Sequence, residues 1–298
     1  MTRTKVLVSL VTEDNDFQQE QAAMARAVAR ELNFDAGIVF AGNDSVEQSL
    51  QLVRAVQCDL ASRPNAIVVE PVGTAMPQVA HAAAEVGIAW VVLNRTADYI
   101  ATLRKTATAP IFGVSSDNEE IGRIQGEQFN KLVPRGGNIL YVEGPSASDV
   151  TRERTAGMLA TKRANIAIRV LRGDWTENSG HRAVASWLKL TTSKEATIQL
   201  VGCQNDEMAL GARRAIEETA SQAERERLLR LPFTGCDGLP KEGQAHVQHR
   251  TLAATIVIPP LTGVALKLLA SALQTHSQPA EHTCTTARSC PPITELRM

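Results

Sequence analysis

The sequence predicts an α/β protein made of two similar doubly wound parallel-sheet lobes, joined by a multi-strand hinge and with a ligand cleft between them. Three observations lead to this prediction. The chain has 298 residues, which is long for one compact core and suits two lobes of ordinary domain size. Short β-branched apolar runs alternate with longer segments of helical period, as in parallel sheets covered by helices. This alternation occurs twice along the chain.

The first half contains five strand candidates separated by helices. The apolar runs that predict strands cover residues 5–11, 36–41, 66–70, 88–93 and 111–115. The segments between them with apolar residues at helical spacing cover residues 17–32, 46–60 and 76–86. This order predicts a parallel sheet with helices on its faces.

The second half repeats the same order. Its strand candidates cover residues 138–142, 166–171, 197–203, 232–236 and 253–257, and helices are expected after Asn118, Val150, Ser179, Asp206, Leu239 and Pro260. The last long helix, 261–273, follows a strand of the second half, but its length suits the first sheet. We therefore predict one lobe from residues 1–115 with about 259–286, and another from 116–258 with about 287–298. Hinges are expected at 115–116, 256–258 and near Ala287.

Composition and motifs argue against several functions. The 31 basic and 32 acidic side chains nearly cancel, whereas nucleic-acid binding needs a dense excess of Lys and Arg. No phosphate loop, dinucleotide fingerprint, nucleophile elbow or zinc-protease motif occurs, so we expect no catalytic residue and no cofactor. His246 and His249 share a helix face, but a solvated face explains them better than a metal site, and we expect no metal.

The cysteines and the first residues bear on the compartment. Five cysteines without a C-x-x-C pair suggest neither a zinc site nor a complete disulfide framework. Cys203 and Cys236 are expected in the core, while Cys284 and Cys290 in the polar tail could pair only under oxidising conditions. No signal segment or membrane span is visible, so we expect a cytoplasmic protein as written, or a periplasmic one if a leader was removed.

Polar and aromatic residues directly after the strands are the candidate ligand contacts, because doubly wound sheets bind ligands at the carboxyl ends of their strands. In the first half, Asn15 and Phe17 could bond a hydroxyl and stack on a sugar ring, or cap and staple a helix. Arg95, beside Asn94, could hold two oxygens or be a solvated charge.

The second half offers contacts at corresponding places. Arg152 opens a helix after a strand, and Trp175 is either a binding platform or a cap on the lobe. Asn205 and Asp237 follow successive strands, where an amide and a carboxylate suit vicinal diols. Asp237-Gly238 is also compatible with a plain turn, and Asp206 with a helix N-cap.

These residues carry a family resemblance that runs through nearly the whole chain. The string Asn205-Asp206-Glu207-Met208-Ala209-Leu210-Gly211-Ala212 is joined by Cys236-Asp237-Gly238, Leu252-Ala253-Ala254-Thr255-Ile256, Ser116-Asp117-Asn118 and Arg152-Glu153-Arg154. Together they resemble the ribose-binding branch of the type I periplasmic binding proteins, which is related to the effector domains of LacI-type repressors.

The resemblance implies a set of ligand contacts. Asn15 and Phe17 match the family's Asn and first aromatic, and the remaining Arg, aromatic, Asn and Asp contacts fall on Arg152, Trp175, Asn205 and Asp237. Three positions depart from the family. Gln18 replaces a second aromatic, Asn94-Arg95 replaces an Asp-Arg pair with the loss of one negative charge, and Ile258 replaces a hinge-strand Gln. The departures imply either a ligand with fewer hydroxyls or one with a negative group.

The function expected from the resemblance is binding of a small sugar, polyol or sugar acid in an interlobe cleft with hinge closure. The chain would serve as the solute-binding component of an ABC-type sugar transporter, with a membrane permease as partner, or as a ligand sensor acting on a sensor protein. The alternative is a cytoplasmic LacI-like effector-binding regulator without its own DNA-binding domain. Neither hypothesis involves direct contact with nucleic acid or insertion into a membrane.

Overall fold

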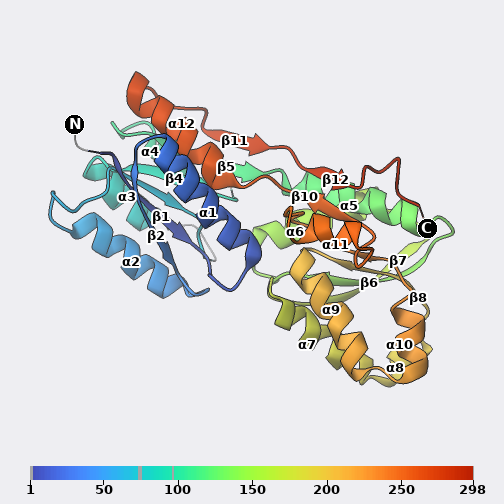
Figure 1. Ribbon diagram of the computed structural model, residues 1–298. Coiled ribbons are helices and arrows are strands. Elements are labelled where there is room, and N and C mark those ends of the chain that lie inside the picture. The colour runs from blue at the N-terminus through green and yellow to red at the C-terminus, as the bar shows by residue number, and fades with distance from the viewer. Residues whose placement is uncertain (1–2, 73–75, 96, 298) are drawn as a thin grey trace. The chain divides into compact units, whose positions relative to one another are not determined.

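The protein consists of two compact units between which the chain passes three times. The computed structural model describes residues 3–72, 76–95 and 97–297. Unit 1 comprises residues 1–116 and 260–285, and unit 2 comprises residues 117–259 and 286–298. The elements of both units are labelled in Figure 1. Each unit is built on its own sheet and has its own cores.

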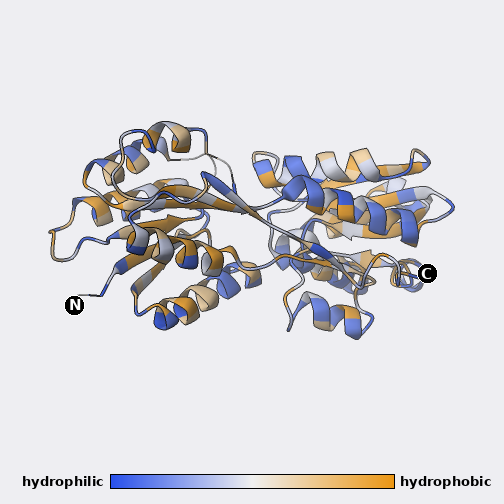
Figure 2. Cartoon of the chain, turned by 90° about the horizontal axis from the view of Figure 1, so that it is seen from above, coloured by the Kyte–Doolittle hydropathy of each residue, from blue (hydrophilic) through white to orange (hydrophobic). Residues whose placement is uncertain are grey.

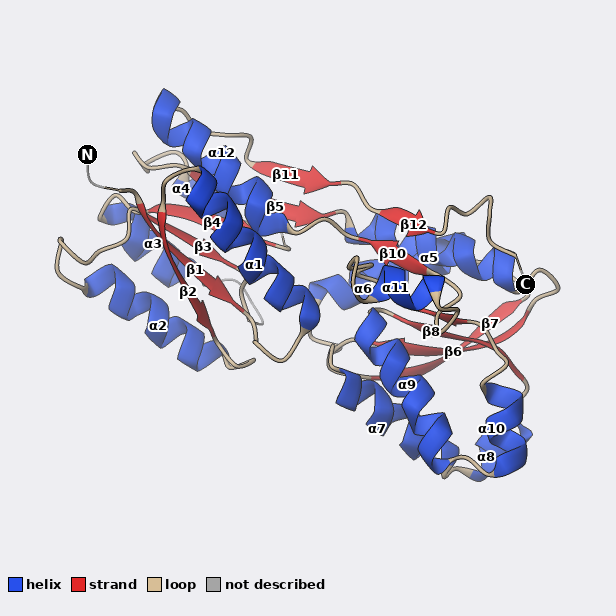
Figure 3. Cartoon of the chain, in the orientation of Figure 1, coloured by secondary structure: helices blue, strands red, loops and turns tan. Residues whose placement is uncertain are grey.

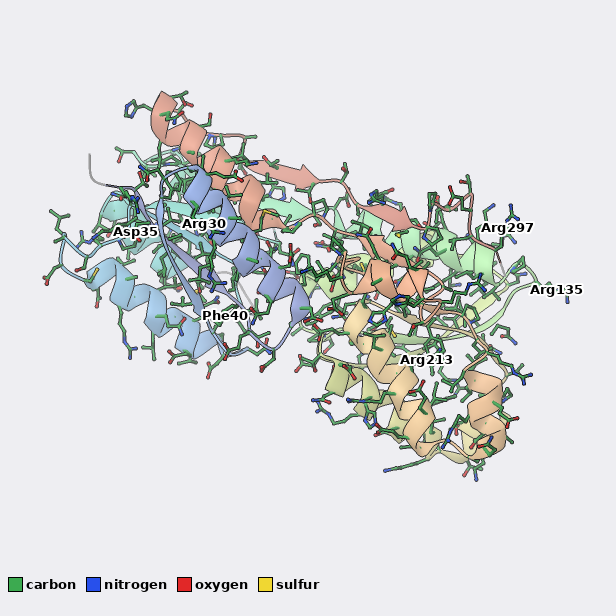
Figure 4. The ribbon with its side chains drawn as sticks, in the orientation of Figure 1. Arg30, Asp35, Phe40, Arg135, Arg213 and Arg297 are labelled. Carbon is green, nitrogen blue, oxygen red and sulfur yellow. The ribbon has the colours of Figure 1, made fainter. Side chains whose placement is uncertain are left out.

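Unit 1 contains a six-stranded sheet in the order β11-β5-β4-β3-β1-β2, in which every neighbouring pair is parallel. The strands are β1 (Lys5–Leu10), β2 (Asp35–Phe40), β3 (Ala66–Val69), β4 (Ala89–Leu93), β5 (Ile111–Ser116) and β11 (His282–Thr285). Asp35 and Phe40, labelled in Figure 4, mark the two ends of the edge strand β2. The order reverses between β1 and β3, which creates a topological switch point there.

Helices cover both faces of the unit 1 sheet. Two of them, α1 (Asp16–Glu31) and α12 (Leu261–Thr275), pack on one face, where Val6, Val8 and Leu10 of β1 share a core with Leu266 and Leu269 of α12. The opposite face carries a second core with α2 (Ser45–Gln57), α3 (Pro77–Glu85) and α4 (Tyr99–Leu103). The prediction that the last long helix covers the first sheet is therefore confirmed.

Unit 2 repeats this strand order with a shorter sheet. Its parallel strands are β6 (Gly137–Glu143), β7 (Ile166–Arg172), β8 (Ile198–Cys203) and β9 (Phe233–Thr234), in the order β7-β6-β8-β9. A separate pair, β10 (Thr255–Val257) with β12 (Arg288–Cys290), is antiparallel. Parallel bridges join Thr234 to Ala254 and Asp237 to Val257, so β10 continues the edge beyond β9. The switch point here lies between β6 and β8.

The helices of unit 2 also divide between two faces. Alternate residues of β6 point to opposite sides. Ile139 and Tyr141 share a core with α5 (Asn118–Leu132) and α6 (Asp149–Thr161), while Leu140 and Val142 pack with α7 (Glu177–Leu188) and α9 (Asp206–Thr219). Three short helices complete the unit, α8 (Thr191–Glu195), α10 (Gln222–Leu228) and α11 (Gly243–Gln248). Figure 3 shows the strands of each unit with helices on both sides, and Figure 2 shows apolar and polar residues side by side on these helices.

Glycines allow two helix pairs in unit 2 to approach closely. A Cβ atom at Gly157 of α6 would lie 1.9 Å from the carbonyl oxygen of Glu119 in α5, and one at Gly122 would lie 2.1 Å from that of Arg154. The helices α7 and α9 approach each other equally closely, since a Cβ at Gly211 of α9 would lie 1.9 Å from the carbonyl oxygen of Glu177 in α7. These positions require glycine, because real Cβ atoms do not approach backbone oxygens so closely.

The predicted fold class is confirmed, whereas several element ends differ from the prediction. The predicted helix 46–60 ends at Gln57, and Leu60 beyond it is 83% exposed. The predicted strand 232–236 is regular over only two residues, because its partner β10 joins it through single bridges. The strands β11 and β12 were not predicted, since their polar residues resemble a loop.

Two of the cysteines lie in the core, as the sequence predicts. Cys203 and Cys236 are buried, as predicted, and burial raises the pKa of the Cys236 thiol to about 12. All five cysteines lie in the described part of the chain and are free thiols, with Cys284 on β11 and Cys290 on β12.

Among the helices of the described residues, none is long and apolar enough to cross a membrane.

Candidate functional site

The first polar cluster of unit 1 forms where β1 leads into α1. Asn15 is the N-cap of α1, and its side-chain oxygen accepts a hydrogen bond from the Gln18 backbone N–H at 3.1 Å. Phe17, in the first turn, is buried with 8% of its surface exposed. The cap interpretation of Asn15 is thus confirmed, while its contact with a ligand stays a prediction.

A buried carboxylate connects two of the predicted site residues. Glu70 directly follows β3 and is 5% exposed. Its Oε2 accepts a hydrogen bond from Gln18 Nε2 at 3.0 Å, and its Oε1 accepts one from Asn94 Nδ2 at 2.9 Å. The structure therefore brings Gln18 from the first turn of α1 and Asn94 from the end of β4 onto one acceptor at the switch point.

Asn94 has a backbone conformation that suits its residue type. Its φ is 59°, in the left-handed region that Asn tolerates better than most residues. Arg95 follows it and is half-buried. The turn after β4 thus aims the Asn94 amide back at the sheet edge, beside the ends of β1 and β3.

The second cluster, in unit 2, is centred on Arg154 of α6. This side chain is 5% exposed. Its Nε donates to Asn118 Oδ1 at 3.1 Å, and its Nη1 donates to the Gln204 carbonyl oxygen at 2.7 Å. The guanidinium carbon lies 5.6 Å from the centroid of the Trp175 ring, within cation–π range. Arg154 therefore connects α5, the end of β8 and the aromatic residue.

Asn205 and Trp175 are held together in the same cluster. Asn205 is the N-cap of α9, with its Oδ1 accepting from the Met208 N–H at 3.0 Å, and its Nδ2 donates to the Trp175 carbonyl oxygen at 2.7 Å. Gly144 makes room for the indole, since a Cβ there would lie 2.2 Å from Trp175 Cζ2. The interpretation of Asp206 as the helix N-cap was wrong, because Asn205 is the N-cap of α9.

Asp206 instead fixes the turn that carries Asp237. Its carboxyl accepts from Thr255 Oγ1 at 2.7 Å and from the Gly238 N–H at 2.8 Å. Burial raises the pKa of Asp206 to about 7 against the lowering effect of these hydrogen bonds. Asp237 itself has a φ of 103°, and its backbone pairs with Ile256 and Ile258.

Two predicted contacts lie apart from these polar side chains. Arg152 lies on the exposed side of α6, where its side chain is 62% exposed and pairs with Asp149. Ile258 is 2% exposed, and its N–H donates to the Asp237 carbonyl oxygen at 3.0 Å. Arg152 is thus separated from the cluster that its neighbour Arg154 enters, because residues two apart on a helix face different sides.

The sequence contained signals for the two residues that it did not single out. Glu70 is the last residue of the predicted strand 66–70, and it is the only charged residue of that apolar run. Arg154 falls in a helical series of buried residues, with Thr151 before it and Met158 after it. That period of three to four residues points to Arg154 rather than Arg152 as the inward-facing arginine.

The described residues contain no group of three or more His, Cys, Asp or Glu side chains that could hold a metal ion. His246, considered above, lies with its Nε2 at 3.8 Å from a carboxylate oxygen of Glu242. This neighbouring carboxylate was not expected from the sequence. The unit 1 cluster consists of two amides on a carboxylate, and the unit 2 cluster adds a guanidinium group beside an indole ring. These groups suit hydrogen bonding to a polar organic ligand.

Two doubly wound units with polar clusters at the carboxyl ends of their strands define a ligand-binding class of protein. The periplasmic binding protein domain matches residues 6–275, and the chain belongs to this family. The predicted family is therefore confirmed.

The chain is similar to several curated ribose-binding proteins. It is 30% identical to the ribose import binding protein of Salmonella typhimurium over 176 residues, covering 57% of this chain and 55% of that protein. It is 26% identical to the ribose import binding protein of Bacillus subtilis over 226 residues, covering 75% and 66% respectively. The match thus spans about half the length of the first of these relatives.

Solved structures share the fold at lower identity. A galactofuranose binding protein superposes with a TM-score of 0.81 at 22% identity, covering 96% of this chain and 93% of the other. A periplasmic solute binding protein of an ABC transporter from Actinobacillus succinogenes, with bound D-allose, gives a TM-score of 0.82 at 18% identity and covers 96% and 97%. At such identities the likeness shows the fold alone.

Proposed function

We propose that this protein binds a small sugar or polyol and catalyses no reaction on it. One observation carries the proposal: in each unit, the side chains at the carboxyl ends of the strands converge into a polar cluster that includes residues expected to contact a ligand. These residues are Gln18 and Asn94 in unit 1, and Trp175 and Asn205 in unit 2. We propose that Asn15, Arg95 and Asp237, which follow strands of the same two sheets, also contact the ligand. We add Arg154 in place of Arg152. Ligand binding with hinge closure, as expected from the resemblance, is part of this proposal.

The chemistry of the clusters supports a polyhydroxyl ligand. Amides both donate and accept hydrogen bonds, carboxylates accept from hydroxyls, and guanidinium groups donate to ring and hydroxyl oxygens. The Trp175 indole, already faced by Arg154, adds an apolar surface of the kind on which a sugar ring stacks. Relatives of this chain are named for binding ribose or allose, which agrees with this chemistry.

The biological role that we propose is delivery of the bound ligand to a membrane permease of an ABC-type transporter, with a sensor protein as the other possible receiver. Binding shifts the protein between an open and a closed population, and the partner recognises the closed one. Co-purification of the ligand-loaded chain with a permease, and its loss on removal of ligand, is the expected result for transport. Retention by a sensor kinase instead would assign the sensing role.

A thermal-shift screen tests ligand binding directly. The panel contains pentoses, hexoses, polyols and sugar acids, with the enantiomer of each chiral hit as a matched control. A ligand at 100 times its Kd stabilises the folded chain by about 2.7 kcal/mol, which raises the melting temperature measurably. We expect at least one neutral sugar or polyol to do so and its enantiomer to fail. A complete panel without any shift would overturn the proposal.

A further inference from the structure

The turns at one end of unit 2 carry a group of basic side chains. Five of them, which we call the basic end, are Lys131, Arg135, Lys162, Arg163 and Arg297. Lys162 is half-buried, and the other four are exposed. The first four lie where α5 and α6 end, just before β6 and β7 begin. They are thus at the amino ends of the strands, whereas the polar cluster of unit 2 lies at the carboxyl ends.

Hydrogen bonds between the two turns bring these residues onto one surface. The Arg163 backbone N–H donates to Asn130 Oδ1 at 2.8 Å, and its Nη1 donates to the Pro134 carbonyl oxygen at 3.2 Å. The Arg135 carbonyl oxygen accepts from Asn165 Nδ2 at 3.4 Å. The turn after α5 and the turn after α6 therefore lie against each other, and their charges are close together.

The last residues of the chain add Arg297 to this surface. Leu296 is 7% exposed and belongs to the same core as Leu132 and Val133, which end α5. Figure 4 shows Arg135 and Arg297 at the same end of unit 2. Segments more than 130 residues apart in the sequence thus contribute basic side chains to one end of the unit.

Acidic side chains are scarce around the basic end. Residues 128–142 and 154–173 include no Asp or Glu. Glu127 and Glu295 are the acidic residues closest to the basic end along the chain, and five positive charges less these two leave a net charge of three positive units. Among the described residues, no side chain of the basic end forms an ion pair. The charges are therefore available to an external anion.

Exposed apolar side chains accompany these charges. Leu159 of α6 is 49% exposed and precedes Lys162 by three residues, about one helical turn. Pro134, next to Arg135, is also exposed. A mixture of basic and aliphatic side chains without deep burial is typical of surfaces that rest on lipid head groups.

The aromatic residues of unit 2 argue against nucleic acid as the partner of the basic end. Nucleic-acid binding of single strands uses exposed aromatic rings on which bases stack. Trp175 belongs to the polar cluster at the other ends of the strands, and the remaining rings are buried, namely Phe129, Tyr141, Trp187 and Phe233. The basic end thus offers charge without stacking, which suits the phosphate groups of a lipid surface.

We propose that the basic end adsorbs to the anionic head groups of a phospholipid membrane, without insertion of any helix. Lys and Arg side chains donate charge-assisted hydrogen bonds to phosphate oxygens. Each basic residue close to an anionic leaflet strengthens adsorption by about fivefold. This surface function is independent of the ligand that the protein binds. Adsorption would keep the protein at the membrane in which a permease or sensor partner lies.

Co-sedimentation of the full chain with lipid vesicles tests the adsorption. One set of vesicles contains equal amounts of phosphatidylglycerol and phosphatidylcholine, and the other contains phosphatidylcholine alone. At low salt we expect binding to the first set and at least about tenfold weaker binding to the second. Raising the salt to about 0.5 M should release the protein, because the Debye length then falls to a few ångströms.

Two variants with the same change in net charge locate the surface. The test variant combines three exposed substitutions and keeps the hydrogen bonds of Arg163 and Asn165: Lys131→Gln, Arg135→Gln and Arg297→Gln. We expect its affinity for the anionic vesicles to fall by about tenfold or more. The control variant removes three exposed basic residues elsewhere in unit 2 and should stay within about threefold: Arg182→Gln, Lys189→Gln and Arg230→Gln.

Several results would overturn the proposal. These are failure of the unmodified chain to bind anionic vesicles, equal binding to both vesicle sets, and equal losses of affinity in the two variants. Retention on immobilised poly-L-glutamate without any binding to vesicles would assign the basic end to an acidic protein instead. Should the test variant not fold, as judged by circular dichroism, Arg135→Gln alone replaces it, with an expected loss of about fivefold. An unchanged affinity in that variant overturns the proposal.

Discussion

At the scale of single residues, Asp206 is a buried residue with an ionisable side chain. Desolvation raises its pKa to about 7, well above the ordinary value of 3.8, although Thr255, Gly238 and the charge of Arg154 favour the ionised form. Between these two pH values the unfolded chain has lost the proton that the folded chain retains. The free energy of unfolding therefore falls as the pH rises from about 4 to about 7 and levels off above that.

The variant Asp206→Asn should remove this pH dependence. Its amide can accept from the Gly238 N–H and donate to Thr255 Oγ1, so both hydrogen bonds survive. We expect the difference in unfolding free energy between the unmodified chain and the variant to fall by up to about 1.4 kcal/mol per pH unit between pH 5 and 7. Urea unfolding at several pH values, followed by circular dichroism, measures it. Parallel curves for the two proteins would show that the residue is ionised throughout.

The two arginines of α6 provide a matched pair. Arg154 is buried with two hydrogen bonds to neighbouring elements, whereas Arg152 is exposed and pairs with Asp149. Arg154→Gln should lower the unfolding free energy by about 3 kcal/mol, because Asn118 and the Gln204 carbonyl lose a charged donor. It should also reduce the affinity for the ligand by about tenfold or more. Arg152→Gln should change stability by less than about 1 kcal/mol. Equal effects of the two substitutions on the affinity for the ligand would contradict the assignment of Arg154 to the site.

At the scale of elements, the close contact of α5 with α6 depends on glycine. This helix contact sets the position of Arg154 relative to Asn118, since Arg154 lies on α6 and Asn118 on α5. Gly157→Ala should destabilise the chain by about 2 kcal/mol or more, because its Cβ would lie 1.9 Å from the Glu119 carbonyl oxygen and the helices must separate.

The control for this substitution is Gly37→Ala on the edge strand β2, where the nearest atom to the new Cβ is Leu7 Cδ1 at 3.9 Å. It should be neutral or slightly stabilising, since alanine lowers the entropy of the unfolded chain. Thermal unfolding of both variants measures the difference. A Gly157→Ala variant as stable as Gly37→Ala would mean that the helix pair can adjust without cost.

Sequence patterns predicted some of the strands and contacts but not others. Strands such as β3 and β4 were predicted because continuous β-branched apolar runs record burial on both faces of a parallel sheet. The strand β11 was missed because His282, Thr283 and Thr285 are polar, and its pairing with β5 comes from a segment more than 160 residues away. Within the site, helical period could have distinguished Arg154 from Arg152, but the hydrogen bonds that join Gln18 and Asn94 through Glu70 depend on three strands being neighbours.

At the scale of the whole molecule, both units use one plan. In each, the second strand flanks the first on one side, the third flanks it on the other, and later strands extend that side. The repeat of strand and helix along the chain was enough to predict two such sheets. The sequence alone could not place the predicted contacts against one another, because the clusters depend on turns such as those at Asn94 and Asp237, where φ is positive.

The last strand and the last long helix of unit 1 come after almost the whole of unit 2 in the chain. During synthesis on the ribosome, β5 is therefore left with an unpaired edge, and the apolar surface destined for α12 stays bare, while residues 117–259 emerge and fold. Unit 1 therefore begins to be synthesised before unit 2, but it can complete its fold only after residues 260–285 have been made. We expect chaperones that bind nascent chains to act mainly on unit 1, on the edge of β5 and on the apolar surface that α12 later covers.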